Sequence, residues 1–268
     1  MRWRDVPGRD AQLNVYNIAA MRMEPPDRFD HVRFDPNNDC NVHCVYCHNH
    51  RSAVQVSTEE FQSFLEQNVT SLGNFQMGCI MEPTLDPRLA DLLMLVARSP
   101  VRPSREFMLQ TNGILLHMHD AGKMRDSGLT SLSISIDAAD PKVHRLLRGG
   151  TSIEKVGRNI AKFKKECPST AIVFITTVTR LNLASVHGLV SFGLGLGVAR
   201  FVFREVFYRT DSDVVDHTRM PELVLRRGEF DEMKRSLRAR FGDEVNFDFA
   251  DEERLERSAV KMILDSRR

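Results

Sequence analysis

The sequence predicts an α/β protein: a partial (β/α)6 open barrel of the TIM type with a short C-terminal α/β extension. Three observations support this prediction. Short β-rich runs alternate with stretches of helical periodicity from about residue 31 to residue 208, which is typical of a parallel sheet covered by helices. The six units found are too few for a closed eight-stranded barrel. One strand carries a polar face, which suits the lumen of an open barrel.

The expected strands are short runs rich in β-branched and aromatic residues. They are His31–Phe34, Phe75–Glu82, Glu106–Gln110, Leu129–Asp137, Ala171–Val178 and Ala199–Val206. The fourth run alternates polar with apolar residues between Ser131 and Asp137. A strand covered by helices on both faces would be apolar throughout. We therefore expect one face of this strand to meet helices and the other to meet a polar lumen, which favours an open barrel over a doubly wound sheet.

Stretches between the strands carry apolar residues at helical spacing. The three stripes are Phe61, Phe64, Leu65, Val69 and Leu72; Leu85, Leu89, Leu92, Leu93 and Val96; and Ile153, Val156, Ile160 and Phe163. We expect Ser152 to be the N-cap of the third helix, which should end before Pro168 because proline cannot continue a helix.

We divide the chain into an N-terminal extension at residues 1–30, a barrel core at residues 31–208 and a C-terminal extension at residues 209–268. Residues 209–226 show no clear period and are expected to form a loop or gate. A helix with apolar residues from Phe230 to Phe241 should follow. The remaining expected elements are a strand at Glu244–Phe249 and a closing helix at Glu252–Ile263.

The composition is that of a globular protein, with 42% hydrophobic residues and a net charge of +1. The longest apolar runs are much shorter than a membrane span, and residues 1–30 lack the order of a secretory signal. We therefore expect a cytoplasmic protein with no membrane partner. The near-neutral charge gives no reason to expect nucleic acid as a partner.

Three of the five cysteines, Cys40, Cys44 and Cys47, fall within eight residues. In a chain without a secretory signal this spacing predicts metal binding rather than disulfides. Three thiolates can hold three irons of a [4Fe–4S] cube and leave the fourth iron open for chemistry. Zinc is the alternative, because a nearby histidine could complete a Cys3His site in a zinc-stabilised binding module.

Five short motifs, in order along the chain, make it similar to the radical S-adenosylmethionine (SAM) superfamily between about Phe34 and Glu205. The cysteine run resembles the cluster loop of that family, including the aromatic Tyr46 before the last cysteine. The other four motifs are Glu82-Pro83, Thr111-Asn112-Gly113, Ser135-Ile136-Asp137 and Arg148-Gly149-Gly150.

The resemblance implies that Cys40, Cys44 and Cys47 hold a [4Fe–4S] cluster, and that reductive cleavage of SAM yields a 5′-deoxyadenosyl radical. A flavodoxin- or ferredoxin-type reductant is implied as a partner. The resemblance also implies a cofactor site. Tyr46 would contact the adenine through its backbone, and Ser135 would contact the ribose. The Met81 main chain and Glu82 would contact the methionine amino group, and Arg148 would pair with the methionine carboxylate. Thr111 and Asn112 would line the methionine end of the site.

The chain departs from the family where two glycines usually precede Glu-Pro. Ile80 and Met81 stand there, and their side chains should narrow or shift the methionine pocket. If the run from Phe75 to Glu82 is a regular strand, Cys79 should point away from the lumen, because it is offset from Glu82 by an odd number.

The expected reaction is hydrogen abstraction from a small organic substrate: a sugar, nucleoside or amino acid derivative. The reason is that no cysteine follows Cys167, so we expect no cysteine-rich C-terminal cluster region of the kind common in peptide-modifying relatives. A peptide substrate is the alternative. Arg204 and Glu205, at the end of the last expected strand, are candidate contacts to the substrate or the adenine.

Overall fold

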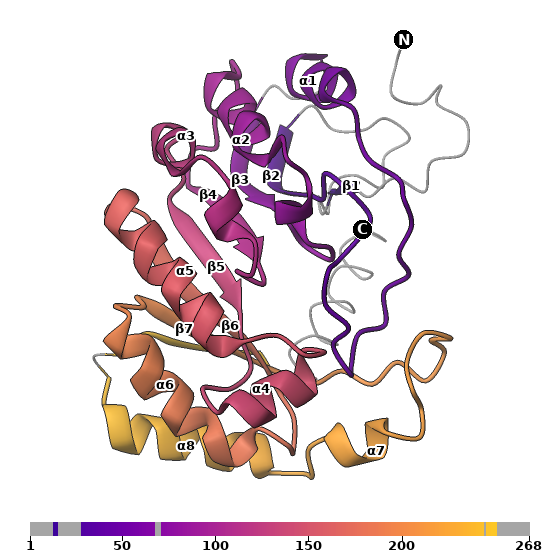
Figure 1. The fold of residues 1–268 in the computed structure, drawn as a ribbon, viewed down its shortest axis with the longest axis vertical. Helices are drawn as coiled ribbons and strands as arrows, with labels where there is room; N and C mark the ends of the chain where they lie inside the picture. Colours follow the sequence, from indigo (N-terminus) through magenta and orange to yellow (C-terminus); the bar gives the residue numbers. More distant parts are fainter. Residues whose placement is uncertain (1–12, 16–27, 68–70, 244, 251–268) are drawn as a thin grey trace, which may run out of the picture.

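The computed structural model describes residues 13–15, 28–67, 71–243 and 245–250, which form one curved sheet with helices on its outer face (Figure 1). The order of strands in the sheet follows the order in the chain, from β1 to β8. β1 pairs antiparallel with β2, and each later strand pairs in parallel with the strand before it. β1 and β8 occupy the two edges, so the sheet is not closed. The predicted open barrel is confirmed.

Apart from β1 and the bounds of β3, the strands lie close to the predicted runs. They are β1 (Leu13–Val15), β2 (Arg28–Phe34), β3 (Ser71–Met77), β4 (Glu106–Thr111), β5 (Ser131–Ser135), β6 (Ala171–Val178), β7 (Arg200–Glu205) and β8 (Phe247–Ala250). The helices are α1 (Thr58–Gln67), α2 (Leu89–Arg98), α3 (Ala121–Asp126), α4 (Pro141–Leu147), α5 (Ile153–Glu166), α6 (Val186–Gly195), α7 (Met220–Leu223) and α8 (Glu229–Phe241). Three short 3-10 turns are η3 (Pro83–Leu85), η4 (Leu116–Met118) and η5 (Leu183–Ser185).

Local polar residues determine where several helices begin. The Ser152 hydroxyl accepts a hydrogen bond from the Lys155 N–H at 3.2 Å, so the predicted N-cap of α5 is confirmed. Asp140 caps α4 in the same way through the N–H of Val143 at 2.9 Å, and Pro141 occupies the first helical position, where its missing N–H costs nothing.

The outer face of the sheet forms the hydrophobic core against the helices. Leu132 and Ile134 of β5 are fully buried there. Phe34 of β2 stacks on Phe61 of α1, with ring centroids 4.3 Å apart. Burial of such apolar side chains is the main favourable contribution to folding.

The inner face of the sheet carries polar and charged residues, as the alternation in β5 predicted. Glu106 of β4 forms an ion pair with Arg200 of β7 at 3.7 Å and accepts a hydrogen bond from the Ser131 hydroxyl at 3.0 Å. Since β5 and β6 separate β4 from β7 in the sheet, this ion pair spans the lumen and requires the sheet to curl. Val173, Ile175 and Val202 form a small apolar cluster on the lumen side.

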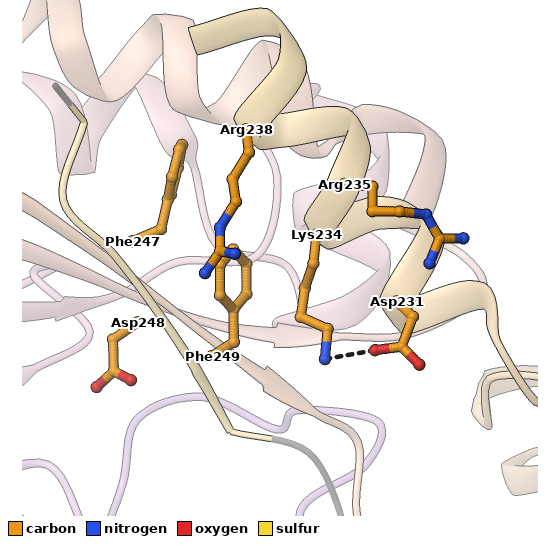
Figure 2. Close-up of a pocket in the computed structure, with 7 residues that line it drawn as sticks. All are labelled: Asp231, Lys234, Arg235, Arg238, Phe247, Asp248 and Phe249. Carbon is orange, nitrogen blue, oxygen red and sulfur yellow. Dashed lines mark ion pairs between the residues drawn. The ribbon is translucent and has the colours of Figure 1, made fainter. Parts of the chain in front are cut away.

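The C-terminal helix α8 packs on one face of β8 (Figure 2). Arg238 lies over the ring of Phe249 at 5.6 Å, and Lys234 forms an ion pair with Asp231 at 2.5 Å. Asp248 points away from α8 (Figure 2) and lines the lumen. The predicted helix from Phe230 to Phe241 is confirmed. The strand expected at Glu244–Phe249 is present as β8, at Phe247–Ala250.

Several expectations about elements are corrected or remain open. The short helix α7 lies within residues 209–226, which were expected to form a loop. β3 begins at Ser71 and ends at Met77, so the expected strand through Glu82 is wrong in both bounds and Leu72 belongs to a strand instead of a helix. The antiparallel β1 was not expected. The expected helix at Glu252–Ile263 lies outside the described residues, and the three-part division of the chain remains a prediction. None of the helices in the described ranges has the length and hydropathy needed to cross a bilayer.

Gly78 directly follows the last residue of β3, and its conformation makes substitution there destabilising. Its φ is +80°, and a Cβ there would lie 2.3 Å from the Gln110 carbonyl oxygen. Gly78→Ala should therefore lower the free energy of unfolding by more than about 1–2 kcal/mol, the cost of a left-handed conformation alone. Gly188→Ala on α6, where a Cβ would meet nothing within 4 Å, is the matched control and should be neutral or stabilising. Equal midpoints of urea unfolding for the two variants would contradict the prediction.

Candidate active site

The lumen opens into a cavity of about 580 Å³ at the carboxyl ends of the strands. In barrels of parallel strands this end carries the functional side chains. Residues from the loop after β2 and from the ends of β3 to β7 line the cavity. They include Cys40, Cys44, Tyr46, Cys47, Met81, Glu82, Thr111, Asn112, Ser135 and Arg148. All ten residues singled out from the sequence as metal or cofactor ligands therefore lie around one space.

The cysteine loop is held in place by its backbone. The Val45 N–H donates to the Leu147 carbonyl at 3.0 Å, which ties the loop to the end of α4. Arg51 donates to the carbonyls of Cys40 and Val42. Gly149 lies against the main chain of the loop: a Cβ at Gly149 would be 2.6 Å from the His43 carbonyl oxygen. Only glycine permits this close approach, which explains one glycine of the Arg-Gly-Gly turn.

The Arg148 side chain is held by the carboxylate of Asp137. Its Nε and Nη2 donate to the two carboxylate oxygens of Asp137 at 2.7 and 3.0 Å, a forked geometry that is among the stronger polar contacts in proteins. Its Nη1 lies 3.8 Å from the Cys44 sulfur. Burial alone would lower the pKa of Arg148, but Asp137 raises it well above its usual value. Arg148 is therefore charged and oriented before any ligand binds.

Asp137 connects three parts of the site. It is fully buried and, besides Arg148, it accepts hydrogen bonds from the Tyr46 hydroxyl at 2.5 Å and the Thr177 N–H at 3.0 Å. Burial raises the pKa of Tyr46, so its hydroxyl stays a donor. Sequence reasoning quoted Asp137 only as part of a motif; its role as the partner of Arg148 was missed.

The Glu82 carboxylate is buried and accepts several hydrogen bonds from the protein. Its Oε1 accepts from the Thr111 hydroxyl at 2.5 Å and from the N–H of Thr84 at 3.1 Å, and its Oε2 accepts from the Asn112 N–H at 2.7 Å. Burial raises the pKa of Glu82, and these donors lower it. A carboxylate offers about four lone-pair sites, and Oε2 accepts fewer hydrogen bonds than Oε1 does. The Asn112 side chain donates to the Asn41 side chain at 2.7 Å, which joins this motif to the cysteine loop.

Asp35 organises the loop after β3 through hydrogen bonds to its main chain. Its carboxylate accepts from the N–H groups of Cys79, Ile80 and Met81 at 2.7, 3.1 and 3.3 Å, and Asp35 itself is buried. Burial raises the pKa of Asp35, and the three N–H donors lower it. Sequence reasoning missed this residue; the available signal was an acidic residue directly after the first expected strand.

The two cysteines outside the cluster motif have different surroundings. Cys79 lines the cavity, so the expectation that it points away from the lumen is wrong. The parity argument assumed a strand, and the chain has already left the strand at Gly78. Cys167 caps the C-terminal end of α5, is buried, and its thiol contacts the Ala121 carbonyl at 3.3 Å, away from the cavity. Arg204 and Glu205 line the cavity.

A family model decides the family. The model of the Radical SAM superfamily matches residues 35–192, which is more than half of the chain and includes every motif described above. The chain belongs to the radical SAM superfamily.

Curated relatives of this radical SAM chain include proteins named as probable GTP 3′,8-cyclases. One from Methanococcus maripaludis is 30% identical over 131 residues, covering 46% of this chain and 41% of the relative. One from Methanosarcina mazei is 25% identical over 193 residues, covering 68% of this chain and 54% of the relative. This chain therefore spans about half the length of the curated relatives it matches, or less.

Solved structures show the same fold. Streptococcus suis SuiB bound to S-adenosylmethionine has a TM-score of 0.62 at 14% identity, covering 83% of this chain and 50% of that one. The structure of anSMEcpe with bound AdoMet and the Cp18Cys peptide has a TM-score of 0.64 at 19% identity, covering 83% of this chain and 63% of that one.

The family implies SAM and an iron–sulfur cluster, and the residues present fit both. Cys40, Cys44 and Cys47 offer three soft thiol ligands on one loop facing one cavity. In the described part of the chain no three His, Cys, Asp or Glu side chains converge as ligands of a single ion, and in a cube each thiolate holds a different iron. Glu82 and Arg148 supply the opposite charges that suit a zwitterion.

The buried ion pair of Arg148 and Asp137 should make the protein sensitive to loss of either partner. Arg148→Met leaves the Asp137 carboxylate buried without its charged partner, so the free energy of unfolding should fall by about 3–5 kcal/mol. The measurement is urea unfolding followed by circular dichroism. Arg209→Met removes an arginine whose ion pair with Asp211 is exposed and should change stability little. Similar losses of unfolding free energy in both variants would show that the buried ion pair contributes no more to stability than the exposed one.

Proposed function

We propose that this protein binds a [4Fe–4S] cluster through Cys40, Cys44 and Cys47, cleaves SAM reductively, and abstracts hydrogen from a small organic substrate. The observation that carries the proposal is that three thiols and the methionine-end residues line one cavity at the carboxyl ends of parallel strands. When bound, the cluster supplies the electron that cleaves SAM to methionine and a 5′-deoxyadenosyl radical. A flavodoxin- or ferredoxin-type protein is the proposed electron donor.

The chain's own residues bind and orient SAM. In this proposal Glu82 accepts from the methionine amino group through Oε2, its less occupied oxygen, and the Met81 carbonyl contributes a second acceptor. Thr111 and Asn112 line the methionine end. Tyr46 seats the adenine through its backbone, and Ser135 meets the ribose.

Arg148 has a narrower role than a free arginine would have. Its Nε and one N–H of Nη2 donate to Asp137, which leaves the two N–H groups of Nη1 and the second N–H of Nη2 to meet the methionine carboxylate. The Asp137 fork sets the direction of these remaining donors. This preorganisation lowers the entropy cost of binding, because the side chain does not have to be ordered when SAM arrives.

The substrate class rests on the relatives. The curated relatives are named for a reaction of GTP, a nucleotide, which agrees with a sugar, nucleoside or amino acid derivative as substrate. A peptide is the second candidate, because the fold is shared with anSMEcpe, whose structure holds a peptide. A zinc-stabilised binding module does not account for the polar cofactor-sized cavity beside the thiols.

The cluster assignment is tested by removing one thiol. Cys44→Ala in protein reconstituted without oxygen should lose the brown chromophore and SAM cleavage, because two remaining thiolates cannot hold the cube. Cys167→Ala, which removes a buried thiol outside the cavity, should keep both. The measurements are iron content, the absorption spectrum and release of 5′-deoxyadenosine. A full iron complement with undiminished cleavage in Cys44→Ala would refute the assignment.

Glu82 is tested separately through SAM affinity. Glu82→Gln keeps the shape but removes the charge that faces the amino group, so SAM should bind at least about tenfold more weakly, as expected for loss of a desolvated charged contact. Met81→Gly leaves the main-chain acceptor in place and should alter affinity little. Calorimetry under anaerobic conditions measures both. If Met81→Gly abolishes binding and Glu82→Gln is silent, the amino group meets a different part of the loop.

A further inference from the structure

We propose that Arg204, together with Arg33, binds an anionic group of the substrate, a phosphate or a carboxylate, within the lumen. This proposal deepens the proposed function, on which it rests, by naming the chemical class of the substrate. Arg33 lies on β2 and Arg204 on β7. β2 and β7 are not neighbours in the sheet, yet both side chains line the same cavity. The two guanidinium groups therefore approach the same space from different walls.

Arg204 differs from the other arginines of the lumen in having its donors unused. Arg148 is forked onto Asp137, Arg51 donates to two carbonyls, and Arg200 pairs with Glu106. Beyond the backbone pairing of β7, the guanidinium of Arg204 receives neither a hydrogen bond acceptor nor an ion pair from the described residues. A guanidinium carries five N–H donors in a planar fork that matches the oxygens of a carboxylate or phosphate. Such a group at the wall of a cavity is suited to bind a ligand.

The local electrostatics also favour an anion between the two arginines. The Arg204 side chain is exposed to the cavity; partial desolvation by the lumen walls lowers its pKa, and the positive charge of Arg33 lowers it further. Asp248 of β8 and Cys79 act in the opposite direction, and Arg33 is itself hydrogen-bonded to His31 Nε2 at 3.2 Å. Asp248 therefore offsets part of the positive charge, but its carboxylate makes no direct ion pair with Arg204. An anion placed between the guanidinium groups would relieve the repulsion of both.

The surroundings of Arg204 indicate where the rest of the substrate would lie. Ile80 and Phe207 also line the cavity and are 42% and 43% exposed, although both are large and apolar. Side chains of this kind are suited to cover the organic part of a bound molecule.

The test uses the reconstituted protein with SAM bound, under anaerobic conditions. Calorimetry with inorganic triphosphate and, separately, with succinate measures anion binding. At least one of the two should bind, and Arg204→Gln should weaken that binding by about tenfold or more. Arg158→Gln removes the same charge from the exposed face of α5 and should leave anion binding unchanged. Binding of triphosphate alone would identify a phosphate group, and binding of succinate alone a carboxylate.

Two outcomes would overturn the proposal: neither anion binds the unaltered protein, or Arg204→Gln binds as tightly as the unaltered protein does. SAM affinity and iron content are measured on the same samples and should not change in Arg204→Gln. If SAM does not bind the unaltered protein, the proposed function fails, and the anion titrations of that protein and its variants still decide whether Arg204 binds anions.

Discussion

The site depends on the buried contact between the Asp137 carboxylate and the Arg148 guanidinium. Asp137 follows the end of β5 and accepts hydrogen bonds from Thr177 of β6, from Tyr46 of the cysteine loop and from Arg148 of the Arg-Gly-Gly turn. Burying two charges is expensive, and such pairs contribute little net stability compared with apolar packing. Their benefit here is geometric, because one carboxylate holds four separate segments in a single arrangement around the cavity.

The periodic elements could be predicted from the sequence because each leaves a local signal. Ser131, Ser133 and Ser135 alternate with buried aliphatic residues, and Ser152 marks the start of α5. The end of β3 could not be predicted in this way, since the apolar run through Met81 has the composition of a strand and only the positive φ of Gly78 shows where the strand ends. The five motifs identified ten residues as predicted metal or cofactor ligands, and the structure places all ten around one cavity. The partner of Arg148 and the role of Asp35 depend on contacts between distant segments, which no local pattern records.

The two halves of the lumen differ in how their polar groups are satisfied. Around Glu82, Asp35 and Asp137 each carboxylate accepts several hydrogen bonds, so this half is rigid before any ligand arrives. On the other side of the lumen the guanidinium of Arg204 makes no hydrogen bond or ion pair with the described residues, and the apolar side chains of Ile80 and Phe207 are exposed. Rigid geometry suits the half that must hold the same cofactor in every turnover, whereas the looser half suits the molecule that distinguishes one enzyme of the superfamily from another.

The contact between Gly149 and His43 has a consequence for how this sequence can diverge. The contact joins two main chains, and the His43 ring turns aside to lie 3.2 Å from Arg51. The position of the loop therefore does not depend on which side chain stands at residue 43, and that residue should tolerate substitution. Residue 149 should not, because any side chain there would push the cysteines away from the turn.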